Sequence, residues 1–354
     1  MKSVVKKTFQ ITITMKHAHL LPCLLLPFLA TLAPSTALAA PTAQTPPSPP
    51  GRGDGGEGAG ASQHVYKKVA GRSLHAHVLT PPDWKATDKR PALVFYHGGG
   101  WVAGNPAGFI KEQGAYLASR GMVVISIEYR LLSRGDRSPP IICTQDAKSS
   151  FRWVRANAAK LGIDPDRIAA AGGSAGGQMA ASIALTPGHD DPADDLKIPL
   201  APAALVLFNP AIGFPDDPAT IAKLAVRFSP EALKFWRTDA PLHHLVKTAP
   251  PMLILSGEND NVVPMKMLQQ FQARAKELGV RCDAVFYPGQ GHAFFHKDKE
   301  NGKYYHATLL EIDKFLTSLG WLQGPPTLKP PPSSDTPAAP AKSQKNRKTK
   351  KAKS

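Results

Sequence analysis

The sequence predicts an α/β protein in which a mostly parallel sheet is covered by helices on both faces. Apolar runs of strand length alternate along the chain with longer segments of helical spacing. Most of these runs are apolar at consecutive positions, as expected of strands that are buried on both faces. One run leads directly into a glycine-rich turn and then a helix, between residues 169 and 185. These observations place a single α/β domain at residues 63–323.

The expected elements follow from periodicity and from glycine and proline breaks. The expected strands are 65–69, 73–79, 91–96, 122–127, 169–173, 204–208, 252–256 and 284–287. The expected helices are 114–120, 145–160, 175–185, 230–236, 263–278 and 305–319. A proline-rich stretch at 209–251, after the sixth strand, is too long for a plain connection. We therefore expect it to form a small cap over the end of the sheet.

Both ends of the chain differ in composition from the predicted domain. Residues 1–39 combine four lysines, an apolar run at 20–33 and the pattern Ala37-Leu38-Ala39, which is typical of a cleaved secretory signal peptide. Residues 40–62 have the composition of a flexible linker, and residues 324–354 that of a disordered basic tail. These ends carry much of the net charge of +16. The sequence thus predicts an exported protein with a mildly basic domain, whose tail could contact anionic polymers.

Cysteine and histidine positions leave a disulfide open and offer little support for a metal. After signal cleavage Cys143 and Cys282 remain; export and the even count would permit a bridge, whereas the element order, which places them at opposite ends of the sheet, argues against one. His75 and His77 share one face of a strand without a third ligand nearby, so we expect a solvated face. No cofactor or metal is expected.

The pattern Gly172-Gly173-Ser174-Ala175-Gly176 is that of a nucleophile elbow, in which a strand turns sharply into a helix and presents a serine. Glycines fit beside the serine because the strained turn leaves no space for a Cβ atom. The helix that follows directs its N-terminal N–H groups at the site, which favours a developing negative charge. The alternative is a glycine-rich strand–helix turn whose serine has no chemical role.

A serine hydroxyl needs a base within hydrogen-bonding reach and an acid to orient that base. Asp260 and His292 each lie in the loop directly after a predicted strand, at the carboxyl end where open α/β sheets build their sites. Glu258 competes with Asp260 for the role of the acid, and His296 competes with His292 for that of the base. His243 and His244 precede the candidate acid in the chain and are expected to be loop or helix-cap residues.

The motif His97-Gly98-Gly99-Gly100 follows an early strand and is the third catalytic signal. Backbone N–H groups of such a loop, with that of the residue after the nucleophile, form an oxyanion hole. The expected donors are therefore Gly99, Gly100 and Ala175. His97 is expected to brace the loop.

These motifs together resemble the α/β-hydrolase esterases of the hormone-sensitive-lipase-like and acetyl-xylan/feruloyl-esterase type. The resemblance covers about 95–296 and rests on the segments 97–101, 128–130, 162–168, 172–177, the Asp260 loop and Gly291-His292. It implies the α/β-hydrolase fold and the carboxylesterase mechanism. The chain departs from the family in having Gln178 where a histidine is usual, and in lacking cap helices before the His97 motif. The second departure predicts a more open site, suited to acyl groups on carbohydrate.

Three functions remain after this comparison. The first is a secreted serine carboxylic-ester hydrolase that removes acetyl or similar short acyl groups from carbohydrate or small esters. The second is a serine peptidase or acyl-aminoacyl hydrolase, because the same three residues can cleave amides. The third is a polyanion-binding module that acts through the basic tail.

Overall fold

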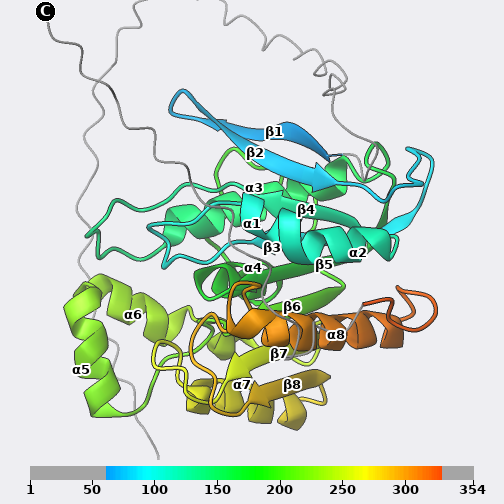
Figure 1. The fold of residues 1–354 in the computed structure, drawn as a ribbon. Helices are drawn as coiled ribbons and strands as arrows, with labels where there is room; N and C mark the ends of the chain where they lie inside the picture. Colours follow the sequence, from blue (N-terminus) through cyan, green and yellow to red (C-terminus); the bar gives the residue numbers. More distant parts are fainter. Residues whose placement is uncertain (1–60, 329–354) are drawn as a thin grey trace, which may run out of the picture. The chain divides into compact units, whose positions relative to one another are not determined.

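The computed structural model of the chain describes residues 61–328, which contain an eight-stranded sheet (Figure 1). Its strands are β1 (Ala61–Val69), β2 (Arg72–Leu79), β3 (Arg90–Tyr96), β4 (Val123–Ile127), β5 (Ile163–Gly173), β6 (Ala204–Phe208), β7 (Met252–Gly257) and β8 (Cys282–Tyr287). They are ordered β1-β2-β4-β3-β5-β6-β7-β8. β2 pairs antiparallel with both β1 and β4, and all other neighbours are parallel. This is the predicted mostly parallel sheet.

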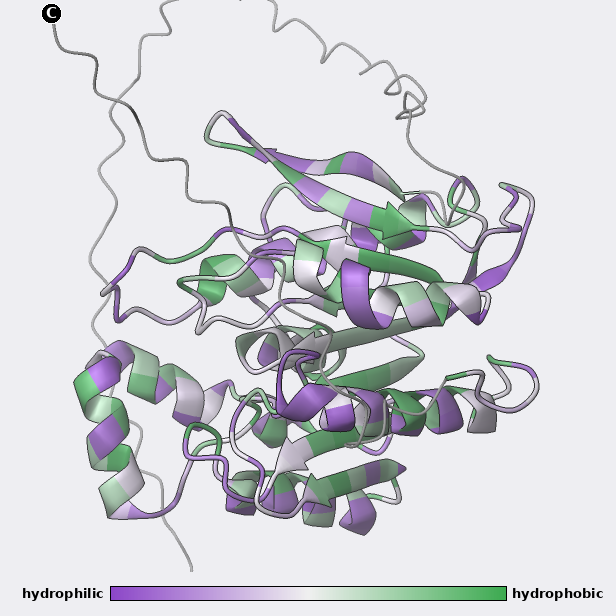
Figure 2. Cartoon of the chain, viewed as in Figure 1, coloured by the Kyte–Doolittle hydropathy of each residue, from purple (hydrophilic) through white to green (hydrophobic). Residues whose placement is uncertain are grey.

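Helices cover both faces of the sheet, as predicted. They are α1 (Ala107–Phe109), η1 (Ile110–Gly114), α2 (Ala115–Ser119), α3 (Ile141–Ala156), α4 (Ala175–Leu185), α5 (Pro218–Arg227), α6 (Pro230–Thr238), η2 (Pro241–His244), α7 (Met265–Glu277), η3 (Glu300–Gly302) and α8 (Lys303–Ser318). One apolar core joins the sheet to α3, α4 and α7, and a second joins it to α2 and α8. In β4, Val123 and Ile125 face the first core and Val124 the second. Burial on both faces explains the continuous apolar runs of the central strands. These strands are largely green, the colour of hydrophobic residues, in Figure 2.

The cap at 209–251 contains more helix than the sequence predicted. In place of one short helix it holds α5, α6 and the 3₁₀ turn η2, and the two α-helices lie together at the left of Figure 1. α6 buries Phe235 and Trp236, whereas α5 buries none of its own side chains. The start of α5 carries a local signal, because the Asp217 side chain accepts a hydrogen bond from the backbone N–H of Thr220. The prediction of a single helix was wrong, because the apolar residues Ile221, Leu224 and Phe228, which have helical spacing, were not recognised as one face of a helix.

Three predicted boundaries also need correction. Residues 61 and 62, assigned to the linker, pair with β2 as the first residues of β1. The folded chain continues past 323, because Arg120 donates to the Gly324 carbonyl (3.1 Å) and Leu328 packs against the second core. α3 covers 141–156 rather than 145–160, since it begins directly after Pro140 and ends at Ala156, with Asn157 as its C-cap. The predicted signal peptide, most of the linker and the tail beyond 328 lie outside the described residues.

Two further features concern thiols and membranes. Cys143 on α3 and Cys282 at the start of β8 are both free, and burial raises the pKa of each thiol to about 12. Among residues 61–328, no helix has the length and apolar character needed to cross a bilayer.

Candidate active site

Ser174 occupies a sharp turn between β5 and α4. Its φ is 53°, a left-handed value that is unusual for a residue other than glycine. Neighbouring glycines make this turn possible by close approach. A Cβ on Gly172 would lie 2.3 Å from the carbonyl carbon of Gly176, and one on Gly176 would lie 1.9 Å from the backbone carbonyl oxygen of Tyr96. The strand–turn–helix context predicted for a nucleophile elbow is therefore present.

His292 and Asp260 lie beside Ser174 in one hydrogen-bonded chain. His292 Nε2 is 2.9 Å from Ser174 Oγ, and His292 Nδ1 is 2.7 Å from Asp260 Oδ2. Because a carboxylate can only accept, Nδ1 carries the proton and Nε2 is free to accept that of the serine. Asp260 Oδ1 also accepts from the backbone N–H groups of Val262 and Val263, each at 2.8 Å. This arrangement can convert the hydroxyl into a nucleophile.

The two competing candidates take other positions. Glu258 is exposed and makes no side-chain hydrogen bond with the rest of residues 61–328. His296 is also exposed; it stacks on Phe295 with ring centroids 4.8 Å apart and lines the same cavity as Ser174. His243 and His244 form the end of η2. The structure thus brings Asp260 and His292 into one hydrogen-bonded chain with Ser174, and Glu258, His296, His243 and His244 lie outside this chain.

Asn209 holds the His292 loop and was not singled out from the sequence. It follows β6, is buried, and its Oδ1 accepts from the Ala293 N–H at 3.2 Å. Both residues have left-handed backbones, with φ of 33° for Asn209 and 59° for Ala293. The Asn209 Nδ2 group is buried without a partner among the described residues, which costs stability. We infer that Asn209 keeps the strained backbone beside His292 in place.

The glycine loop after β3 lies against the serine turn. Gly99 and Gly100 have φ of 121° and 62° and line the cavity beside Ser174. The side chain of Arg227 from the cap approaches Gly100 closely, and the left-handed backbone at Gly100 favours glycine. Ala175 is fully buried and is the first residue of α4. The three predicted oxyanion donors therefore lie on the two segments that meet at Ser174.

His97 braces this loop. Its Nδ1 donates to the Gly98 carbonyl at 2.8 Å, and its own carbonyl accepts from the Tyr129 hydroxyl at 2.8 Å. The imidazole stacks on the Tyr129 ring with centroids 4.2 Å apart. Burial lowers the pKa of His97, although the hydrogen bond to Gly98 and the charge of Glu128 oppose this shift. His97 is thus held as a neutral ring.

Gln178 anchors Trp101, the residue that follows the glycines. Its Oε1 accepts from Trp101 Nε1 at 3.1 Å, and its Nε2 donates to Ser182 Oγ at 2.8 Å. Trp101 in turn contacts the cap through Trp236, with ring centroids 5.2 Å apart. The glutamine that departs from the family pattern therefore connects the nucleophile helix to the glycine loop and the cap.

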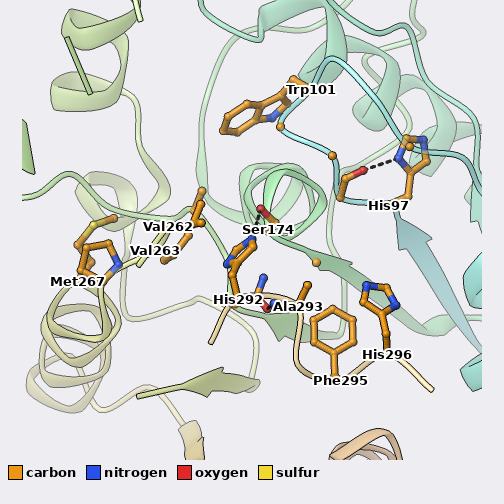
Figure 3. Close-up of a pocket in the computed structure, with 18 of the residues that line it drawn as sticks. His97, Trp101, Ser174, Val262, Val263, Met267, His292, Ala293, Phe295 and His296 are labelled. Carbon is orange, nitrogen blue, oxygen red and sulfur yellow. Dashed lines mark hydrogen bonds between the residues drawn. The ribbon is translucent and has the colours of Figure 1, made fainter. Parts of the chain in front are cut away.

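A cavity of about 600 Å³ surrounds Ser174 and has two chemically different halves. Figure 3 shows Val262, Val263 and Met267 on one side of the Ser174–His292 pair, and His97, Phe295 and His296 on the other. The first side, under the cap, is mostly apolar, and the cap also contributes Thr220 and Arg227 to the cavity wall. Asn105, Glu112 and Gln113 also line the cavity. We assign Glu112 and Gln113 to the second side because Phe109, which directly precedes their turn, stacks on Phe95, and Phe208 links Phe95 to Phe295. We call the two sides the apolar half and the polar half.

The family of the chain follows from this geometry together with a sequence match. Residues 93–296 match the model of a family described as having the alpha/beta hydrolase fold. The chain belongs to this α/β-hydrolase family. The matched segment begins in β3 and ends just after the His292 loop, so it includes every element that contributes to the site. No group of three or more His, Cys, Asp or Glu side chains in the described α/β-hydrolase domain is arranged to hold a metal ion.

Known proteins with similar chains are named as esterases. An apo structure of Thermogutta terrifontis esterase 2 is 39% identical, with a TM-score of 0.68 over 75% of this chain and 96% of that one. The probable carboxylic ester hydrolase LipM of Mycobacterium tuberculosis is 29% identical over 59% of this chain and 50% of its own length. Esterase LipC of the same organism is 30% identical, over 59% of this chain and 54% of its own length. The chain thus spans about half the length of LipM and LipC.

Proposed function

We propose that the protein is a serine carboxylic-ester hydrolase that removes short acyl groups. The observation that carries this proposal is the unbroken chain from Asp260 through His292 to Ser174, with separations of 2.7 and 2.9 Å. The esterase names of its relatives agree with it.

The reaction follows from the positions of the groups. Ser174 Oγ attacks the ester carbonyl carbon while His292 Nε2 takes the hydroxyl proton. Negative charge that develops on the carbonyl oxygen is stabilised by the N–H groups of Gly99, Gly100 and Ala175. His292 then gives its proton to the departing alcohol, which leaves an acyl group on Ser174. Water, deprotonated by His292, releases the acid and restores the hydroxyl.

The restriction to short acyl groups rests on the apolar half of the cavity. Most of its wall is apolar and comes from Leu224 and Phe228 in the cap, Val263 before α7 and Met267 on α7, beside Thr220 and Arg227. Structures of Thermogutta terrifontis esterase 2 are titled as bound to propionate and to butyrate. Acyl chains of similar length suit this half of the cavity.

Export is a separate part of the proposal and rests only on the sequence of residues 1–39. Fractionation of cells that express the full chain, with N-terminal sequencing of the product, tests it. A mature N-terminus near residue 40 in the exported fraction is the expected result, and retention of the full chain in the cytoplasm would refute it.

The ester-hydrolase proposal is tested with a series of p-nitrophenyl esters and peptide anilides. Wild type should hydrolyse acetate to butyrate esters, Ser174→Ala should lose this activity, and Ser119→Ala, an exposed serine on α2, should retain it. One relative is titled as phosphorylated by paraoxon, so intact mass should reveal a single diethylphosphoryl adduct that Ser174→Ala does not form. Anilide cleavage without ester cleavage would instead indicate a peptidase.

A further inference from the structure

We propose that the polar half of the cavity is a subsite for a hydroxyl-rich alcohol, such as a sugar ring, from which the acyl group is removed. This inference rests on the proposed ester hydrolysis and specifies its substrate. It assigns binding roles to Glu112 and Gln113, which the reaction described above does not use.

Glu112 and Gln113 are polar residues in a part of the cavity wall that offers them no partner. Gln113 is only 3% exposed and makes no side-chain hydrogen bond to any of the described residues. Glu112 is half-buried and likewise has no hydrogen bond or ion pair within residues 61–328. Both line the cavity. Buried residues normally have their polar groups paired, so the amide of Gln113, which meets only the cavity, points to a ligand that supplies its hydrogen bonds. The half-buried carboxylate of Glu112 lies next to it in the chain and is free to accept from the same ligand.

The backbone that carries the pair is unusual. Both residues lie in η1, a single π-helical turn between α1 and α2. Such turns are rare in proteins, and those that occur are often found at functional sites. Here the turn lies beside the sheet, because Phe109, the residue before it, stacks on Phe95 of β3 with centroids 3.6 Å apart. The π turn thus carries two adjacent polar side chains next to an aromatic wall.

The chemistry of this half favours hydroxyl groups over a cation. A carboxylate accepts hydrogen bonds and a carboxamide both donates and accepts them, which matches alcohols that do both. A quaternary ammonium could use the Glu112 charge and the aromatic faces, but it would leave the Gln113 amide unpaired. Phe95, Phe109 and Phe295 provide flat apolar surfaces for the C–H faces of a ring.

The other half of the cavity supports the same assignment. Leu224, Phe228, Val263 and Met267 provide most of its wall beside Thr220 and Arg227, so an alkyl chain is stabilised there and most hydroxyl groups of a sugar would lose their hydrogen bonds with water. With the acyl chain seated there and the ester carbon at Ser174, the alcohol portion extends into the polar half. The two halves thereby distinguish the two portions of the ester.

The test compares two acetate esters that differ only in the alcohol. The values of kcat/KM are measured for a monoacetylated methyl hexoside and for phenyl acetate. In Glu112→Leu and in Gln113→Met, the ratio of the first value to the second should fall about tenfold or more, mainly through KM of the hexoside ester. Lys111→Gln changes an exposed neighbour in the same turn and should leave the ratio unchanged. A ratio within threefold of wild type in both subsite variants would overturn the proposal.

Two further measurements separate this inference from its alternatives. Acetylcholine hydrolysed better than either ester, with the preference lost in Glu112→Gln, would overturn the hydroxyl assignment in favour of a cation site. Binding of the unacetylated methyl hexoside to Ser174→Ala, followed by saturation-transfer NMR, reports on the subsite without any hydrolysis. We expect binding that Glu112→Leu weakens. Its absence in an active esterase would refute the subsite alone, whereas binding without any ester hydrolysis would refute the proposed function alone.

Discussion

Replacing Asp260 by asparagine should remove most of the activity while keeping the shape of the site. The carboxylate accepts three hydrogen bonds: Oδ1 from the N–H groups of Val262 and Val263, and Oδ2 from His292 Nδ1. Asparagine has one carbonyl oxygen and one NH₂ group, so it cannot accept on both sides. Turning the NH₂ toward the two backbone N–H groups leaves both without an acceptor, at about 1–3 kcal/mol each.

The favoured orientation therefore keeps the carbonyl toward the backbone and points the NH₂ at His292. The imidazole must then carry its proton on Nε2, where it can no longer accept from Ser174 Oγ. Loss of the correct tautomer in a Ser-His-Asp arrangement lowers kcat by about 10⁴-fold, or about 5 kcal/mol of transition-state stabilisation. Because the two backbone hydrogen bonds survive, the stability to urea should change little.

Steady-state hydrolysis of p-nitrophenyl acetate measures this effect, with Glu258→Gln as the matched control. Glu258 lies two residues away, is exposed, and loses the same charge in its variant. Its kcat should stay within about twofold of wild type, since a surface charge has a small effect. An Asp260→Asn enzyme within fivefold of wild type, or an equal loss in Glu258→Gln, would refute the assignment of the acid.

Three other predictions follow from residues that support the site. Asn209→Ala removes the acceptor of the Ala293 N–H and should lower kcat roughly tenfold with little change in KM; Asn209→Asp keeps an acceptor, and a variant no better than alanine would contradict the positioning role. Gln178→Leu leaves the buried Trp101 Nε1 group unpaired, so urea unfolding should report a loss of about 1–3 kcal/mol, and unchanged stability would show that the hydrogen bond contributes nothing. Burial lowers the His97 pKa below its usual value of 6.5, so the unfolded chain binds a proton first as the pH falls. The free energy of unfolding should therefore decrease below about pH 6.5, and less steeply in His97→Asn; equal slopes would contradict this.

Much of the site could be predicted because its residues follow directly from strand ends. Parallel strands have their carboxyl ends at the same edge of the sheet. Ser174, Asp260 and His292 all lie in segments that follow strands, so they are expected at this edge. The two supporting residues could not be recognised in this way. Asn209 also follows a strand, but its hydrogen bond to Ala293 depends on two left-handed backbones that no local pattern specifies. Gln178 was noticed as a departure from the family, without any indication that it would bind Trp101.

The sequence by itself determined the sheet, the helices on its faces and the order of the candidate catalytic groups. Buried strands and amphipathic helices are encoded by short-range apolar periodicity, and the elbow by its glycines. Only the tertiary structure decided the second cap helix, the choice of Asp260 over Glu258, and the division of the cavity into an apolar and a polar half. Each of these depends on contacts between segments far apart in the chain, such as the meeting of the cap with Gly100 and of η1 with β3. The apolar pattern of a single segment does not show which distant segment it will contact.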